Sequence, residues 1–144
     1  MEISRKAIPY TPNDKALSEM KIGIVSTAGA HLKDQEPFSE DQTVGDNTYR
    51  VIPSDSAATD FSVTHAAPKH EYDTDEPKQD INTIFPIDRL RELTDQGVIG
   101  GVADNHFSMM GFAMRLRQLI NETIPELAKK VNRSKADGIL LTAG

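Results

Sequence analysis

The chain has 144 residues, a net charge of −6 at neutral pH and no cysteine. The length fits one domain, because domains usually contain roughly 100–200 residues. The negative charge argues against a surface for nucleic acid or anionic membranes, since phosphates need patches of Lys and Arg. The absence of Cys excludes disulfides, Cys-ligated zinc and thiol catalysis within these residues. With no apolar run near the ~20 residues of a membrane helix and a polar start, MEISRKAIPY, we predict a cytoplasmic protein.

The N-terminal part of the chain is predicted to be an irregular arm followed by a buried strand. We expect residues 1–20 to form the arm and residues 21–144 to form the N-terminal part of an α/β domain. The segment MKIGIVSTAG contains an apolar run that Ser, Thr and Gly then interrupt. A continuous apolar run is typical of a strand covered on both faces, as in parallel sheets.

Two further strands and two acidic loops are predicted before the middle of the chain. YRVIP (49–53) and DFSVTH (60–65) have the composition of short strands. Residues 30–47 are polar and acidic, and we predict a long loop there, which in a compact domain is usually functional or disordered. Residues 68–80 are predicted to form a second acidic loop.

The second half of the chain is predicted to be helical up to a last strand. NTIFPIDRLRELTDQGVIGG begins as a strand-like run and becomes a short helix that Pro86 opens and Gly97 ends. Residues 103–120 are predicted to begin at a turn and continue as an amphipathic helix. Thr123 and Glu126 have the spacing of a capping box for a new helix, although a kinked continuation fits as well. ADGILLTAG then forms a strand.

The phrase GIVSTAG (23–29) returns as GILLTAG (138–144), with five of seven positions identical. We interpret the two segments as equivalent strands of an open, mainly parallel α/β sheet with flanking helices, which we expect to be incomplete on its C-terminal side. Ligands of such sheets bind outside the carboxyl ends of the strands. That edge is predicted to gather the following candidates: Thr27, Ala28, Gly29, His31, Thr64, His65, Thr142 and Gly144.

Histidines supply the candidate chemistry at this edge. His31, with Glu36 as a partner, could act as a general acid or base, because a pKa near neutrality suits proton transfer. His65 has the same potential. For both residues the alternative is a histidine that faces solvent or anchors a loop. His65 and His70, together with Glu71, Asp73 and Asp75, do not have the spacing of a metal site, so no metal is predicted.

His106 offers a different possibility, because it stands at the expected start of a helix. The free N–H groups of a helix N-terminus could bind an anionic ligand such as a carboxylate. The alternative is that Asn105 or Ser108 merely caps the helix. The segment GVIGGV does not have the GxGxxG spacing of a dinucleotide-binding loop.

Six blocks of sequence, in order, resemble a known family. They are STAGAHLKDQEPF, YRVIPSD, SVTH, INTIFPIDRLREL, GVIGGVADNHFSMMG and ADGILLTAG. The chain from about Lys21 onward is similar to the selenoprotein subunit of D-proline reductase and to component B of the glycine, sarcosine and betaine reductases. In that family a strand like LLTAG is followed at once by selenocysteine, with cysteines close behind. The resemblance therefore implies that the nucleophile follows Gly144, at a UGA codon read as a stop.

The resemblance also implies a reaction and its partners. The D-proline enzyme opens the ring of its substrate to 5-aminopentanoate, while a pyruvoyl group on a separate subunit holds the substrate amine. A selenolate attacks the α-carbon and cleaves the C–N bond, and a dithiol or a redox protein supplies the electrons. Because the 144 residues hold no such nucleophile, we expect this chain alone to be inactive. The family blocks do not say which histidine or glutamate contacts the substrate.

Other interpretations stay open at this point. The substrate could be glycine, sarcosine or betaine rather than D-proline, although the short distance to the expected nucleophile favours the D-proline type. The chain could also be a non-catalytic α/β module or an inactive truncation product. A racemase-like enzyme is a third alternative that rests on fold analogy alone, and the lack of Cys argues against it.

Overall fold

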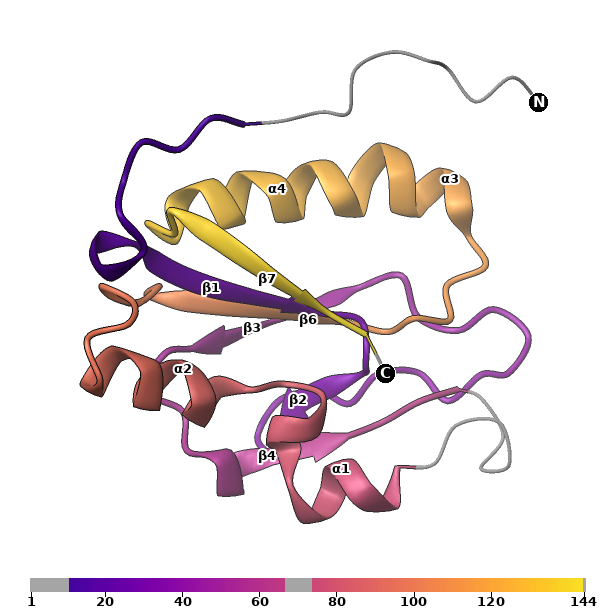
Figure 1. The fold of residues 1–144 in the computed structure, drawn as a ribbon. Helices are drawn as coiled ribbons and strands as arrows, with labels where there is room; N and C mark the ends of the chain where they lie inside the picture. The colour runs from indigo at the N-terminus through magenta and orange to yellow at the C-terminus, as the bar shows by residue number, and fades with distance from the viewer. Residues whose placement is uncertain (1–10, 67–73, 144) are drawn as a thin grey trace, which may run out of the picture.

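A five-stranded sheet forms the centre of the computed structural model, which describes residues 11–66 and 74–143 (Figure 1). Four of its strands run parallel, and β3 is antiparallel to its neighbour β6. β1 is central, with β7 on one side and β5 and β6 in line on the other. The expected mainly parallel α/β sheet is confirmed. The strands are β1 (Lys21–Ser26), β3 (Tyr49–Pro53), β5 (Gly101–Val102), β6 (Asn105–Met109) and β7 (Gly138–Thr142).

Helices cover both faces of this sheet (Figure 1). α2 (Ile87–Asp95) lies on one face. On the other face, α3 (Leu116–Gln118), a π turn (Leu119–Thr123) and α4 (Ile124–Arg133) run on as one helix. Within the described ranges, no helix is long and apolar enough to cross a membrane.

A second, smaller sheet lies on the α2 side of the main sheet. It consists of β2 (Ala30–Leu32) and β4 (Phe61–Val63), which pair in antiparallel fashion. The remaining elements of the described residues are the short helix α1 (Asp75–Gln79) and three single 3-10 turns (Leu17–Glu19, Ala58–Asp60 and Ile81–Thr83). The 3-10 turn at Leu17–Glu19 is the only regular element in the described part of the predicted arm.

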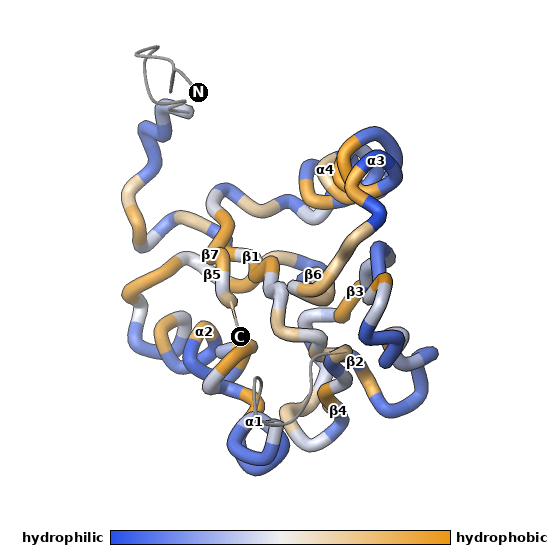
Figure 2. Tube along the Cα trace, turned by 90° about the vertical axis from the view of Figure 1, so that its right-hand side faces the viewer, coloured by the Kyte–Doolittle hydropathy of each residue, from blue (hydrophilic) through white to orange (hydrophobic). Residues whose placement is uncertain are grey.

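The apolar run of β1 is divided between two cores. Ile24 is fully buried on the α2 side, where it packs in one cluster with Phe85, Ile87 and other residues. Val25 points to the other face and packs against a second cluster that includes Phe107 and Leu127. In Figure 2 hydrophobic and hydrophilic stretches alternate along the chain. A strand that is buried on both faces explains why its sequence shows no alternation.

The helix predicted over residues 103–120 is wrong in its first half. The strand β6 occupies Asn105–Met109 of this region, and the helix begins only at Leu116. Phe107 and Met109 belong to the core beneath α4, whereas His106 stacks edge-on against Phe85 on the α2 side. Because both faces of β6 are buried, its apolar side chains mimic helical spacing when they are combined with those of the following loop.

Several boundaries differ from the expectation in informative ways. Thr123 makes no side-chain cap and has helical dihedral angles, so the capping box is wrong and the continuous helix is right. The strand-like start before Pro86 is instead a 3-10 turn. The opening of α2 after Pro86 and the stop at Gly97, which has φ of +71°, are confirmed. β2 and α1 were not predicted from the sequence.

Candidate functional site

The parallel strands β1, β6 and β7 end at one edge of the main sheet (Figure 1). In the pairing of β1 with β7, Ser26 lies opposite Thr142, and in its pairing with β6 it lies opposite Ser108. The backbone N–H of Thr27 donates to the carbonyl of Thr142, with the two atoms 3.0 Å apart. The sheet topology thus brings the ends of both related phrases side by side.

A glycine turn after β1 joins this edge to the smaller sheet. Gly29 donates its N–H to the carbonyl of Met109 and accepts from the N–H of Thr64. Its φ is +71°, and a Cβ at this position would lie 2.1 Å from the carbonyl oxygen of Thr64. Only glycine combines this backbone conformation with so close an approach. The glycine that ends the STAG phrase is therefore required by the geometry that joins β1, β6 and β4.

Hydroxyl groups from both phrases meet one carbonyl beneath the sheet. Ser26 Oγ donates to the carbonyl of Ile84 at 3.1 Å, and Thr142 Oγ1 donates to the same oxygen at 2.8 Å. Ser26 Oγ also accepts from the N–H of Ala28. These hydroxyls hold the ends of β1 and β7 against the segment that leads into α2.

Thr27 and His65 both lie close to Gly111. A Cβ built on Gly111 would lie 3.9 Å from His65 Nε2, 4.0 Å from Thr27 Oγ1 and 3.2 Å from the Thr27 carbonyl oxygen. Gly111 is exposed, and the two side chains are half-buried. A side chain at position 111 would fill the space between them. This grouping of an imidazole and a hydroxyl beside an open backbone position is the strongest candidate site in the described residues.

Partial burial affects the pKa of His65. It lowers the pKa of the imidazole from its ordinary value, because the charged form loses hydration. The lowered pKa favours the neutral ring at pH 7, and a neutral imidazole has one donor and one acceptor nitrogen. Sequence reasoning identified Thr27 and His65 but missed Gly111, for which the only signal was a glycine directly after the SMM run.

His31 is placed differently from His65. It is buried on β2, where Nδ1 lies 2.9 Å from the carbonyl of Leu32 and Nε2 lies 3.0 Å from Thr64 Oγ1. A carbonyl can only accept, so Nδ1 carries the hydrogen and Nε2 accepts from Thr64. Both nitrogens thus serve contacts inside the protein. Thr64 is half-buried, and its hydroxyl connects β4 to this ring.

Two other predicted site residues are Glu36 and Gly144. Glu36 is exposed in the stretch after β2, and its backbone carbonyl accepts from Arg50 Nε. The hydrogen bonds of His31 go to Leu32 and Thr64 rather than to Glu36. Gly144 lies outside the described residues, as do His70, Glu71 and Asp73.

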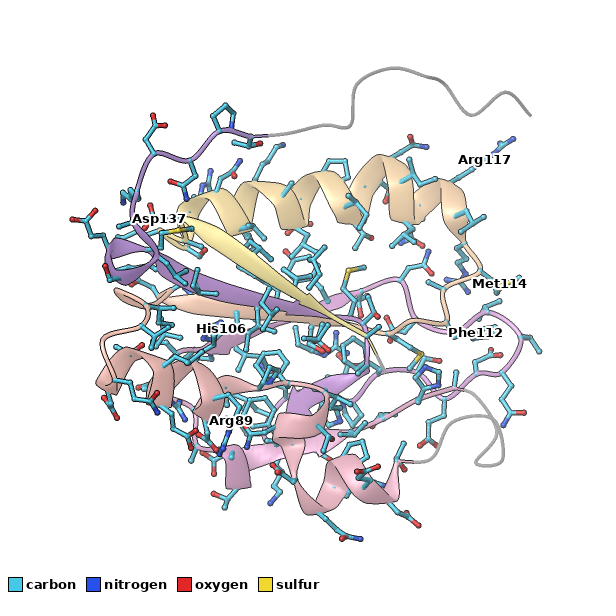
Figure 3. The ribbon with its side chains drawn as sticks, in the orientation of Figure 1. Arg89, His106, Phe112, Met114, Arg117 and Asp137 are labelled. Carbon is cyan, nitrogen blue, oxygen red and sulfur yellow. The ribbon has the colours of Figure 1, made fainter. Side chains whose placement is uncertain are left out.

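His106 lies in a strand, so its expected place at a helix N-terminus is wrong. Its fully buried ring lies between the main sheet and the α2 layer (Figure 3). The Nδ1 atom accepts from the backbone N–H of Ile24 at 3.0 Å, where β1 faces the gap between β5 and β6. Burial, with a smaller effect of Arg91, lowers the pKa of His106 to about 4. The neutral imidazole thus replaces a missing backbone acceptor.

The described residues offer no metal site, and the cavity between β4 and α1 lies away from this edge. Across residues 11–66 and 74–143, no group of three or more His, Cys, Asp or Glu side chains could hold a metal ion. A cavity of about 450 Å³ lies between β4 and α1, where Lys33, Lys78 and Asp80 are among its lining residues. That cavity is separate from the carboxyl edge of the main sheet.

Comparison with known proteins defines the family. Residues 3–144 match the model of glycine/sarcosine/betaine reductase selenoprotein B (GRDB). The chain belongs to this family. It is 36% identical, over 135 residues, to the D-proline reductase subunit gamma of Acetoanaerobium sticklandii, a match that covers 94% of this chain and 53% of that protein.

Two further relatives are more distant. The glycine reductase complex component B subunit gamma of Symbiobacterium thermophilum is 25% identical over 94% of this chain and 31% of its own length. The sarcosine reductase complex component B subunit beta of Peptoclostridium acidaminophilum is 30% identical over 72% of this chain and 23% of its own length. The chain thus spans about half the length, or less, of these relatives. No solved structure matches the chain.

Proposed function

We propose that this chain is the N-terminal part of the selenoprotein subunit of a D-proline reductase. The reaction is the reductive cleavage of the C–N bond of D-proline to 5-aminopentanoate, with a dithiol as electron donor. The observation that carries this choice is the 36% identity to the D-proline reductase subunit gamma, against 25% and 30% for the glycine and sarcosine reductase components. Component B of a glycine, sarcosine or betaine reductase is the alternative, because the family model covers those complexes.

The carboxyl edge of β1, β6 and β7 is the proposed location of the chemistry. A selenocysteine directly after Gly144 would supply a nucleophile that is anionic at neutral pH, and a pyruvoyl group would belong to a partner subunit. The edge is compatible with an anion, because Thr27 contributes a hydroxyl and His65 a neutral imidazole that can donate a hydrogen bond. In this proposal Thr27 and His65 orient the substrate or donate to it.

The codon after Gly144 gives the first test. UGA, followed by an open frame that encodes cysteines, is the expected result. UAA or UAG at this position, or UGA without such a frame, would contradict the proposed selenocysteine. The identity of this codon also decides whether a non-catalytic chain is the better interpretation.

The reaction is tested with the longer subunit and its pyruvoyl partner, with dithiothreitol as donor. We expect 5-aminopentanoate to form from D-proline and no product to form from glycine, sarcosine or betaine. The opposite specificity would establish the alternative. The 144-residue chain, assayed by itself, is expected to be inactive.

The site is tested by His65→Ala and Thr27→Ala in the same subunit. Each change should lower kcat/KM for D-proline by at least about tenfold, since each removes a group that we place beside the reacting centre. Thr59→Ala, which removes a hydroxyl beside the distant α1 cavity, is the matched control and should leave activity unchanged. Full activity of both edge variants, with unchanged unfolding free energy, would dismiss these two residues.

A further inference from the structure

The outer side of β7 combines an unpaired strand edge with exposed apolar side chains. Within the described residues β7 pairs with β1 alone. Leu141 lies opposite Val25 and therefore points to the α4 side of the sheet, but its side chain is 75% exposed. An unpaired edge with large exposed apolar residues marks a place where another polypeptide segment binds.

The helix above this face carries a matching apolar line. Leu116, Ile120 and Ile124 recur every four residues and are 58%, 63% and 43% exposed. Glu126 reaches across the opposite flank of α4 to accept a hydrogen bond from Tyr49 on β3. With Leu127 directed at the sheet, helical geometry turns Ile120 and Ile124 toward the β7 side.

Figure 2 shows how these two apolar features relate. α3 and α4 lie over the side of the sheet that holds β6 and β3, and β7 lies to one side of them. α4 therefore covers the core around Phe107 but leaves Leu141, on the same side of the sheet, 75% exposed. We name the outer edge of β7 together with Leu116, Ile120, Ile124 and Leu141 the β7 flank.

The handedness of parallel crossovers predicts which kind of segment would bind the β7 flank. The chain passes from β6 through α4 to β7, with the helix on one face. Such crossovers are right-handed in about 98% of cases. A unit that continued outward from β7 with the same hand would place its helix on the α4 side. That helix would cover Leu141 and lie against Ile120, while its strand paired with the open edge of β7.

We infer that the β7 flank docks a strand and an amphipathic helix from the part of the family's polypeptide that lies outside the match. The length of the relatives supports this occupant, because the match covers only 53% of the D-proline reductase subunit gamma. The inference rests on family membership and on the exposed surface. It does not depend on the substrate. The labelling test below can therefore fail while the proposed reaction holds, and the proposed reaction can fail while the labelling test succeeds.

The lack of Cys allows a direct test by thiol labelling. Leu141→Cys places a reporter on the β7 flank, and Leu17→Cys places a control on an exposed apolar residue of the arm. Each variant is labelled with iodoacetamide, both as the free chain and within a chimera, and read by peptide mass spectrometry. In the chimera, this chain replaces its matched counterpart in the Acetoanaerobium sticklandii subunit.

We expect residue 141 to react at least about tenfold more slowly in the chimera than in the free chain, with residue 17 unchanged, because docking removes the thiol from solvent. Equal rates at residue 141 in the two proteins would overturn the inference. Protection of residue 141 in the free chain that grows with its concentration would also overturn it, since a second copy would then be the occupant.

A chimera that does not fold, as shown by urea unfolding, is replaced by co-expression of this chain with the unmatched part of the same subunit. The wild-type chain and the Lys130→Glu control, on the opposite flank of α4, should both capture that part. Ile120→Glu should weaken capture at least about tenfold, because it places a charge in an apolar contact. Capture that is equal for all three chains, or absent for all three, would contradict the docking surface.

Discussion

β1 and β7 share a phrase but not an environment. GIVSTAG lies in the centre of the sheet, where β1 has paired neighbours on both sides and packs into cores on both faces. GILLTAG lies at the edge, where Leu140 and Leu141 are exposed. The position of a strand in the sheet, rather than its local sequence, therefore decides how much each of its residues contributes to the free energy of unfolding. The following predictions test this difference, from the largest expected effect to the smallest.

The neighbours Ile24 and Leu140 should differ most in their effect on stability. Ile24→Ala should lower the free energy of unfolding by about 3–4 kcal/mol, because it leaves a cavity in a fully buried core. Leu140→Ala should cost about 1 kcal/mol, since its side chain is already 38% exposed. Urea unfolding of both variants measures the difference. Similar losses would show that β7 is as well packed as β1.

Gly29 tests the turn that ends the central phrase. Gly29→Ala should cost about 3 kcal/mol, because the new Cβ adds a collision with the Thr64 carbonyl to the strain of a positive φ. Gly97→Ala is a matched control with the same φ of +71° and no atom within 4 Å of the new Cβ. It should cost only about 1 kcal/mol. Equal thermal shifts in the two variants would mean that the Thr64 carbonyl moves aside freely.

His106 tests the other edge of β1, which faces β5 and β6 rather than β7. Its pKa is about 4 in the folded chain and ordinarily 6.5, so the unfolded state binds more protons between these values and stability falls as the pH is lowered. From pH 7 to pH 5 this group should cost about 2 kcal/mol. Urea unfolding at both pH values measures the loss. His106→Gln, which keeps an acceptor but does not titrate, should remove most of it; an unchanged pH dependence would contradict the assignment.

Leu141 should give the smallest change. Leu141→Asp is expected to alter the unfolding free energy of the free chain by no more than about 0.5 kcal/mol, because the side chain is mostly in water. Val25→Asp, at the opposing position on β1, should be far more destabilising because it places a carboxylate against Leu127. A large loss for Leu141→Asp would indicate that the β7 flank is already covered by a copy of the chain.

Much of this fold follows from local sequence signals. The runs at 21–26, 49–53 and 138–142 were identifiable as strands because each is a short apolar segment followed by residues that favour turns. Pro86 and Gly97 defined α2 because their backbone preferences act locally. The shared edge of β1 and β7 followed from their parallel arrangement, which the structure confirms.

The missed features depend on contacts between distant residues. The sequence of β6 resembles that of a helix because both of its faces are buried, which removes the alternation that would identify a strand. His106 could not be placed from sequence, since its partner Ile24 is 82 positions away. The placement of Thr27 and His65 beside Gly111 depends in the same way on how the smaller sheet meets the main one.

The carbonyl of Ile84 has a mechanical consequence for the edge. It accepts from Ser26 Oγ and from Thr142 Oγ1, and these two bonds use both of its lone pairs. Neither strand end can slide along its axis relative to the other without breaking one of these bonds. The carbonyl of Ile84 therefore adds, to the backbone ladder between β1 and β7, a contact from a segment that belongs to neither strand. Any displacement of the start of α2 would move both strand ends together.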